Sequence, residues 1–170
     1  MRGRWIIAAK PNIKVTVDAI CGHPAPGSFT GTQAYNSYFQ NWPAWAQEGI
    51  VDMNLPMAYF NCDGSYAADF YGWLCFTRNN SFNRQNALTP GVYSASCLVE
   101  QLDATRNYYC PGAPPSNGVS IYSYYTLDSA LYPTVRSVWT SPVSTPTMTW
   151  KTRPPKAISR AASCMAAAPG

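Results

Sequence analysis

The sequence predicts an α/β fold built as a partial (β/α)8 barrel of the TIM type, with about four β/α units. Short apolar runs typical of strands alternate along the chain with segments of helical spacing. The midpoints of these runs, at positions 15, 51, 88 and 119, are 36, 37 and 31 residues apart. A complete barrel of about 250 residues averages roughly 31 residues per unit. An open doubly wound sheet fits the same alternation, but no glycine-rich phosphate-binding turn follows any of the runs.

Four strands and four helices account for this alternation. The predicted strands cover residues 13–20, 50–55, 87–93 and 118–124, and some are almost continuously apolar, which is typical of strands covered on both faces. Three segments between them carry apolar side chains at helical spacing. These side chains are Tyr35, Tyr38, Phe39, Trp42 and Trp45; Tyr66, Phe70, Trp73 and Leu74; and Leu98, Leu102, Thr105 and Tyr109. A weaker fourth helix is predicted around 128–139.

The first of these helices carries two local signals. Gly49 follows it, as a helix stop requires. Pro43 lies inside it and costs about 3 kcal/mol if the helix continues past this position. We expect Trp42, Trp45 and Trp73, which lie on helix faces, to pack in the core.

The length of 170 residues suits one domain with a core of its own. Residues 1–140 are predicted to form the partial barrel. Residues 141–170, a proline-rich linker and an alanine-rich tail, are predicted to be poorly ordered. No apolar stretch approaches the roughly 20 residues of a membrane-spanning helix. The apolar run at 5–9 is too short for a signal peptide, so none is predicted.

The net charge of +4 comes from the two ends of the chain. Between residues 15 and 150 there are four basic and eight acidic side chains, so this body carries 4 − 8 = −4. A nucleic-acid-binding domain needs a basic stripe on its folded surface. Nucleic acid is therefore excluded as a partner.

The cysteines and the single histidine give no metal or cofactor signal. Six cysteines are scattered without a C-x-x-C pair, and His23 beside Cys21 is too little for a zinc site. No metal and no cofactor are expected. The even count allows disulfides in an oxidising compartment, but a chain of this length folds without them, so the state of the thiols stays open.

Two long segments, 34–42 (AYNSYFQNW) and 45–59 (WAQEGIVDMNLPMAY), resemble the glycosyl hydrolase-like 10 family of bacterial β/α-barrel proteins. Residues 90–93 (PGVY) and 118–124 (GVSIYSY) resemble the ends of its seventh and eighth strands, and 10–15 (KPNIKV) the approach to the fifth. The resemblance covers roughly residues 5–140. It implies that the chain is the C-terminal half of the catalytic barrel.

The resemblance also implies an activity and a location. Family members cleave glycan strands, with bacterial peptidoglycan as a substrate of some, and they are exported to the cell envelope. Their acidic motif of the type DGIHFD, after the fourth strand, has no counterpart here. We therefore expect no efficient cleavage by this chain alone. A half barrel leaves two strand edges unpaired, which predicts a missing N-terminal half or a homodimer as partner.

The candidate catalytic residues are two carboxylates. Cleavage of a glycosidic bond normally uses a pair about 5 Å or 6.5–9.5 Å apart, and a barrel carries them at the carboxyl ends of its strands. Asp63 lies on such a strand-end loop, and Asp18 lies in the first predicted strand, where its side chain could face the lumen. Asp63 is alternatively a turn residue before Gly64, and Asp128 is expected to cap a helix.

The candidate substrate-binding residues are aromatic or lie at a strand mouth. Tyr59, Tyr93 and Tyr124 fall at strand ends, where flat rings with a hydroxyl suit sugar binding. Tyr122 shares a strand face with Tyr124. His23, next to the mouth of the first strand, is a further candidate. The alternative is that some of these rings pack under helices and that His23 is an ordinary loop residue.

Three functions remain open at this point. The chain is a fragment of a glycan-cleaving barrel that is inactive alone, a carbohydrate-binding module without turnover, or a truncated gene product with no function of its own.

Overall fold

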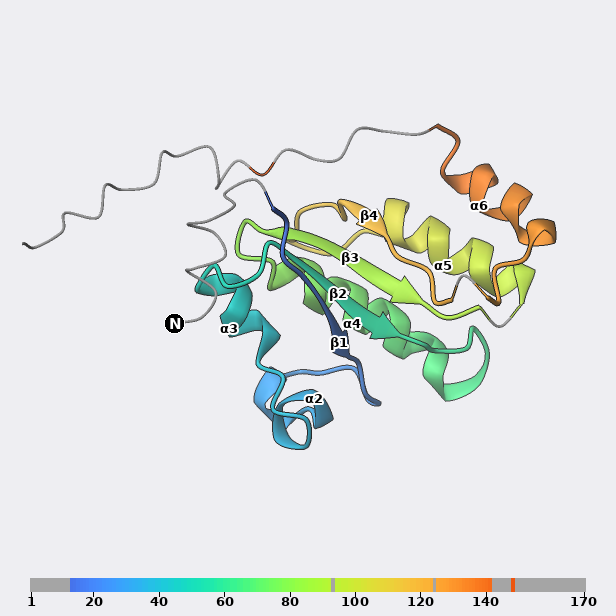
Figure 1. Cartoon of the computed structure of the whole chain (residues 1–170). Coiled ribbons are helices and arrows are strands. Elements are labelled where there is room, and N and C mark those ends of the chain that lie inside the picture. Colours follow the sequence, from blue (N-terminus) through green and yellow to red (C-terminus); the bar gives the residue numbers. More distant parts are fainter. Residues whose placement is uncertain (1–12, 93, 124, 142–147, 149–170) are drawn as a thin grey trace, which may run out of the picture.

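The computed structural model describes residues 13–92, 94–123, 125–141 and 148, and this part of the chain forms one sheet flanked by helices (Figure 1). The strands are β1 (Thr16–Ile20), β2 (Met53–Ala58), β3 (Gln85–Pro90) and β4 (Gly118–Val119). All neighbouring strands are parallel, and their order in the sheet, β1-β2-β3-β4, is also their order in the sequence. The predicted α/β class is confirmed.

The helices alternate with the strands as predicted. They are α2 (Gln33–Asn36), α3 (Trp42–Gln47), α4 (Ala67–Asn79), α5 (Ala95–Asn107) and α6 (Tyr132–Val138). Short 3₁₀ turns precede three of them: η1 (Phe29–Gly31), η2 (Gly64–Tyr66) and η3 (Ser129–Leu131). Among the described residues, no helix combines the length and the apolar character that crossing a membrane requires.

The strand order places the helices on one side of the sheet. Because nearly all crossovers between parallel strands are right-handed, a sheet whose strands follow chain order carries its connecting helices on one face. Figure 1 shows α4 and α5 on the same side of the sheet. A doubly wound sheet instead reverses its strand order at a switch point, and the described sheet contains no reversal.

The main hydrophobic core lies between the sheet and helices α3 and α4. Trp42 and Trp73 are fully buried in it, and Trp45 is partly buried against it, so the predicted core role of the three tryptophans is confirmed. A smaller core joins α5, α6 and β4 around Leu98 and Leu102.

The two faces of the sheet differ in exposure. In β2, Asn54, Pro56 and Ala58 are buried on the side that faces the helices. Met53, Leu55 and Met57 point to the other side and are partly exposed. We call this partly exposed side the second face. Asp18 of β1 belongs to it and is exposed, because the adjacent Ala19 is buried in the core. Among the four described strands, β3 is buried along its whole length, which confirms that some strands are covered on both faces, whereas β1 and β2 each keep one partly exposed face.

The first predicted helix is not continuous. It is divided into α2 and α3, with Phe39 between them at a φ of 54° and 82% exposed. Pro43 explains the break, because it lies in the first turn of α3, where its missing N–H leaves no bond unmade. Gly49 follows α3 at a φ of 74°, which confirms the predicted stop.

Other element boundaries also differ from the prediction. Tyr66 precedes α4 and Tyr109 follows α5; both side chains are exposed, so their predicted place on apolar helix faces is wrong. The last strand ends at Val119, and among the described residues that follow it Tyr122 pairs again, in an isolated bridge with Gly91. The predicted linker and tail lie outside the described residues, except for 141 and 148.

Four cysteines form two disulfides, which settles the state that the sequence left open. Cys62 pairs with Cys97, and Cys75 pairs with Cys110. The first bond lies near the beginnings of α4 and α5, and the second near their ends. Of the described cysteines, Cys21 is the one left unpaired.

Candidate functional site

The best candidate site lies at the carboxyl end of the sheet, on the loop that joins β2 to α4. This loop, residues 59–66, contains the predicted site residues Tyr59 and Asp63 and ends at Tyr66. In Figure 1 it lies on the side to which the strands point. Side chains alternate along a strand, so Tyr59 continues the row of Met53 and lies on the second face.

Two tyrosines, one directly after β2 and one in the segment after β4, stack at this end. The ring centroids of Tyr59 and Tyr122 are 4.8 Å apart, with an angle of 24° between the ring planes. Tyr122 is held beside β3 by two backbone hydrogen bonds, from its N–H to the oxygen of Pro90 (3.0 Å) and from the N–H of Val92 to its own oxygen (3.1 Å). It remains 57% exposed, whereas Tyr59 is half-buried. We call these two residues the tyrosine pair.

The 59–66 loop is fixed to helix α5 at two points. The disulfide Cys62–Cys97 joins it to the first turn of α5. The buried side-chain amide of Gln101 donates a hydrogen bond of 2.7 Å to the backbone oxygen of Phe60. Both contacts hold residues close to Tyr59 in sequence, so the ring of Tyr59 projects from a restrained backbone.

His23 lies on the loop after β1 and pairs with a carboxylate that the sequence prediction missed. Its Nδ1 atom is hydrogen-bonded to Oδ2 of Asp69, in the first turn of α4. The other oxygen of Asp69 accepts the N–H of Ala25 at 2.6 Å. The His23 side chain is 49% exposed and that of Asp69 only 7%.

One sequence signal could have pointed to Asp69. It lies four residues before Trp73 on the same buried side of α4, which makes it an acid on an apolar face. Trp73 also reaches the His23 loop, because its Nε1 donates to the oxygen of Gly22 at 2.7 Å. A buried carboxylate among such neighbours needs hydrogen-bond donors, and His23 and Ala25 supply them.

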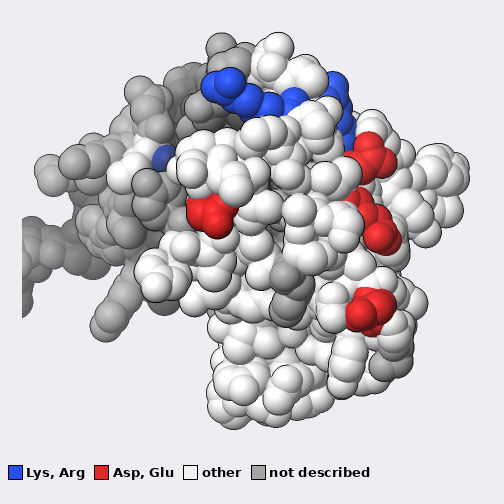
Figure 2. Space-filling view, turned by 90° about the vertical axis from the view of Figure 1, so that its right-hand side faces the viewer, with Lys and Arg blue, Asp and Glu red and all other residues white. Residues whose placement is uncertain are grey.

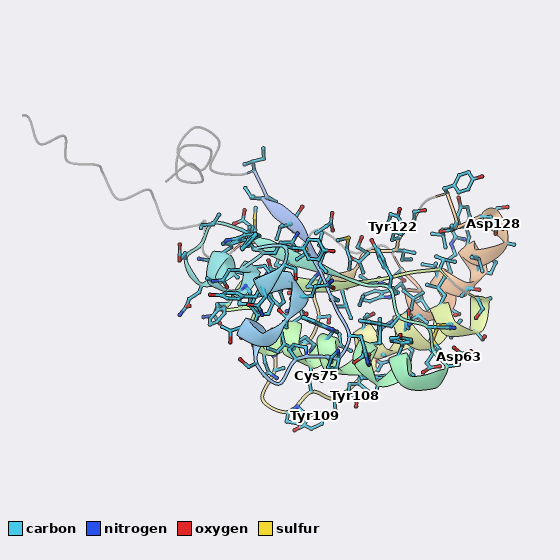
Figure 3. The ribbon with its side chains drawn as sticks, turned by 90° about the horizontal axis from the view of Figure 1, so that it is seen from below. Asp63, Cys75, Tyr108, Tyr109, Tyr122 and Asp128 are labelled. Carbon is cyan, nitrogen blue, oxygen red and sulfur yellow. A yellow bond between two sulfur atoms is a disulfide. The ribbon has the colours of Figure 1, made fainter. Side chains whose placement is uncertain are left out.

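The candidate catalytic carboxylates lie on different parts of the fold. Asp63 is exposed and precedes Gly64, which has a φ of 69°; its side chain makes no capping bond to η2. Asp18 projects from the middle of β1. Asp128 caps η3 by accepting the N–H of Ala130 at 2.9 Å, as predicted. Figure 3 shows Asp63, Asp128 and Tyr122 at the same end of the molecule.

The surface at this end is mostly uncharged. Figure 2 looks onto it from the side to which the strands point and shows the acidic side chains as separate groups. Among the described residues, no three histidine, cysteine or acidic side chains are grouped so that they could hold a metal ion. Burial raises the pKa of the Cys21 thiol well above its usual value, so this thiol is protonated at neutral pH and a poor nucleophile. Tyr93 and Tyr124 lie outside the described residues.

Comparison of the chain with protein-family models, with curated proteins and with solved structures finds no match.

Proposed function

We propose that this chain binds a glycan at the carboxyl end of its sheet and does not cleave it. The observation that carries the proposal is the tyrosine pair, in which a half-buried Tyr59 supports an exposed Tyr122. Parallel α/β folds bind their ligands at this end of the strands. The glycan class comes from the family resemblance, and peptidoglycan glycan is its best representative.

A sugar presents flat patches of C–H groups flanked by hydroxyls. An aromatic ring matches the patch with apolar area, and a phenolic hydroxyl adds a hydrogen bond. Stacking on Tyr59 occupies one side of Tyr122 and leaves its other side for a ligand. Because the supporting loop is fixed by Cys62–Cys97, little conformational entropy is lost when a ligand binds.

The placement of the acids supports binding over cleavage. A glycosidase needs two carboxyl groups on either side of one bond. Asp128 already caps a helix, and Asp18 projects from within a strand, which leaves Asp63 as the acid on the strand-end loop. On this basis Asp63 is a hydrogen-bonding residue for sugar hydroxyls.

We further propose that the four units are half of a (β/α)8 barrel. The strand order and the one-sided helices support this arrangement, and the partner would be an N-terminal half or a second copy of the chain. Two disulfides favour an oxidising compartment, which agrees with the export that the resemblance implies.

The first test is calorimetric titration of the pure chain with soluble peptidoglycan glycan fragments. Tyr122→Ala is expected to weaken binding about tenfold, since an aromatic contact contributes about 0.5–1.5 kcal/mol beyond its area. Tyr109→Ala is the matched control, because Tyr109 is 79% exposed and lies far from Tyr122 in Figure 3.

Equal loss of affinity in both variants, or none in Tyr122→Ala, would contradict a site at the tyrosine pair. Release of new reducing ends from the glycan would contradict the absence of cleavage.

A further inference from the structure

His23 combines an exposed ring with a buried anchor. Half of its side chain is open to solvent, and its Nδ1 atom is bonded to the buried carboxylate of Asp69. Here the ring is oriented from one side and accessible from the other.

The hydrogen-bond partners determine where the proton of the neutral ring lies. An ionised carboxylate only accepts hydrogen bonds, and Asp69 accepts the N–H of Ala25 with its second oxygen. Nδ1 of His23 must therefore donate to Asp69. In the neutral imidazole, Nε2 then carries the lone pair. This atom makes no hydrogen bond within the described part of the chain.

The loop that carries His23 is held rigidly against α4. Gly72 allows the close approach, because a Cβ atom added there would lie 2.5 Å from Cβ of Ala25. The ring of Tyr66 packs edge-on against the His23 ring, at 5.0 Å between centroids and an angle of 71°. His23 also lines a hollow of about 290 Å³ formed by its own loop and by residues such as Gln33.

Tyr66 connects this cluster to the tyrosine pair. The 59–66 loop begins with Tyr59, which stacks on Tyr122, and ends with Tyr66, which contacts His23. One restrained loop thus supports an aromatic group at each end, with the exposed Asp63 between them. A ligand along this loop would meet an apolar ring first and a hydrogen-bond acceptor next.

We propose that His23 and Asp69 form a second carbohydrate subsite, in which Nε2 of His23 accepts a hydrogen bond from a sugar hydroxyl. Asp69 is a positioning residue that fixes the tautomer and the orientation of the ring. The proposal rests on the glycan-binding function and adds the group that recognises hydroxyls. It involves no bond breaking in the ligand.

The experiment uses the fact that the chain has a single histidine. Diethyl pyrocarbonate adds to an accessible neutral imidazole, and the absorbance change at 240 nm reports His23 alone. Wild-type protein is modified with and without chitotetraose, a soluble glycan of N-acetylglucosamine, whose binding is measured in parallel by calorimetry. We expect bound chitotetraose to slow the modification about threefold or more, since a hydrogen bond to Nε2 blocks its lone pair.

Two variants separate positioning from folding. In Asp69→Asn, long-range ¹H–¹⁵N spectra should show loss of the Nδ1–H tautomer that wild type has, with slower modification. Glu48→Gln, at an exposed acid after α3 and outside the 59–66 loop, should leave both readouts unchanged. His23→Gln is expected to weaken chitotetraose binding about three- to tenfold, as loss of one hydrogen bond predicts.

Each outcome is decisive. Binding of chitotetraose without protection of His23 overturns the subsite and leaves the proposed function standing. A wild-type ring protonated at Nε2 overturns the role of Asp69. Failure of chitotetraose and peptidoglycan fragments to bind contradicts the proposed function and the subsite with it.

Discussion

Arg78 of α4 fixes the segment that follows α5. Its guanidinium is buried and donates to the backbone oxygens of Tyr108 (2.7 Å) and Pro114 (2.6 Å). Arg78→Met is expected to cost about 2–4 kcal/mol of the free energy of unfolding, because it leaves two acceptors without their donor. The measurement is urea denaturation, with Arg136→Met as control at an exposed arginine. A loss below 1 kcal/mol would show that water replaces the guanidinium.

Single residues were predictable where the signal is local. Gly49 at a helix end and Asp128 at a helix start depend on neighbours within a few positions, and both predictions are confirmed. Asp69 was missed because its partner His23 lies 46 residues away. Only the packing of α4 against the loop after β1 brings the two together, and no local pattern encodes that packing.

Helices α4 and α5 are joined by a pH-sensitive hydrogen bond. The hydroxyl of Tyr71 donates to Oε1 of Glu100 at 2.6 Å. Burial of the phenol, together with this hydrogen bond and the charge of Glu100, raises the pKa of Tyr71 to about 12. The unfolded chain has the ordinary tyrosine pKa of about 10. The contribution to stability is therefore complete below pH 10 and is lost as the pH rises toward 12.

Tyr71→Phe should thus flatten the decline in stability between pH 10 and 12. Denaturation midpoints measured across that interval give the test, and Tyr132→Phe, at an exposed tyrosine outside this helix pair, is the control. Equal slopes in wild type and Tyr71→Phe would mean that the phenol titrates normally in the folded protein.

Elements were predictable in type and order, and less so in extent. Apolar spacing identified α4 and α5, whose buried faces contain Trp73 and Leu102. It failed at Phe39, where aromatic residues at helical spacing suggested one helix although Pro43 favours a new start. Periodicity counts apolar positions, and it does not register the backbone hydrogen bond that a proline cannot make.

At the scale of the whole molecule, the two disulfides should contribute differently to stability and to binding. Each joins cysteines 35 residues apart, so chain entropy alone gives about 4 kcal/mol for either bond. Cys110 is buried in the core, and serine there costs more. We expect C75S/C110S to be the less stable double variant in urea and C62S/C97S to be the one that loses glycan affinity. Similar affinity in both would contradict the role of the 59–66 loop.

The overall α/β architecture followed from the spacing of four apolar runs, because one β/α unit has a nearly constant length. The pairing of the cysteines could not be predicted from the sequence, since six cysteines without a C-x-x-C motif permit many connectivities. Tyr59 was expected at a strand end and Tyr122 on the strand face that it shares with Tyr124. Their stacking on each other was not predicted, because it depends on where the segment after β4 meets β3 in three dimensions.

The two disulfides interleave along the chain, and this has a mechanical consequence. Cys75 follows Cys62 by 13 positions, and Cys110 follows Cys97 by 13 positions. The shortest covalent path from Cys62 to Cys110 therefore runs through one disulfide and 13 residues, instead of through the 48 residues of the backbone. If a single molecule is stretched from its termini, the disulfides prevent a length of 35 residues from extending until both bonds are reduced. At about 3.3–3.6 Å per residue, reduction would lengthen the fully extended molecule by about 120 Å.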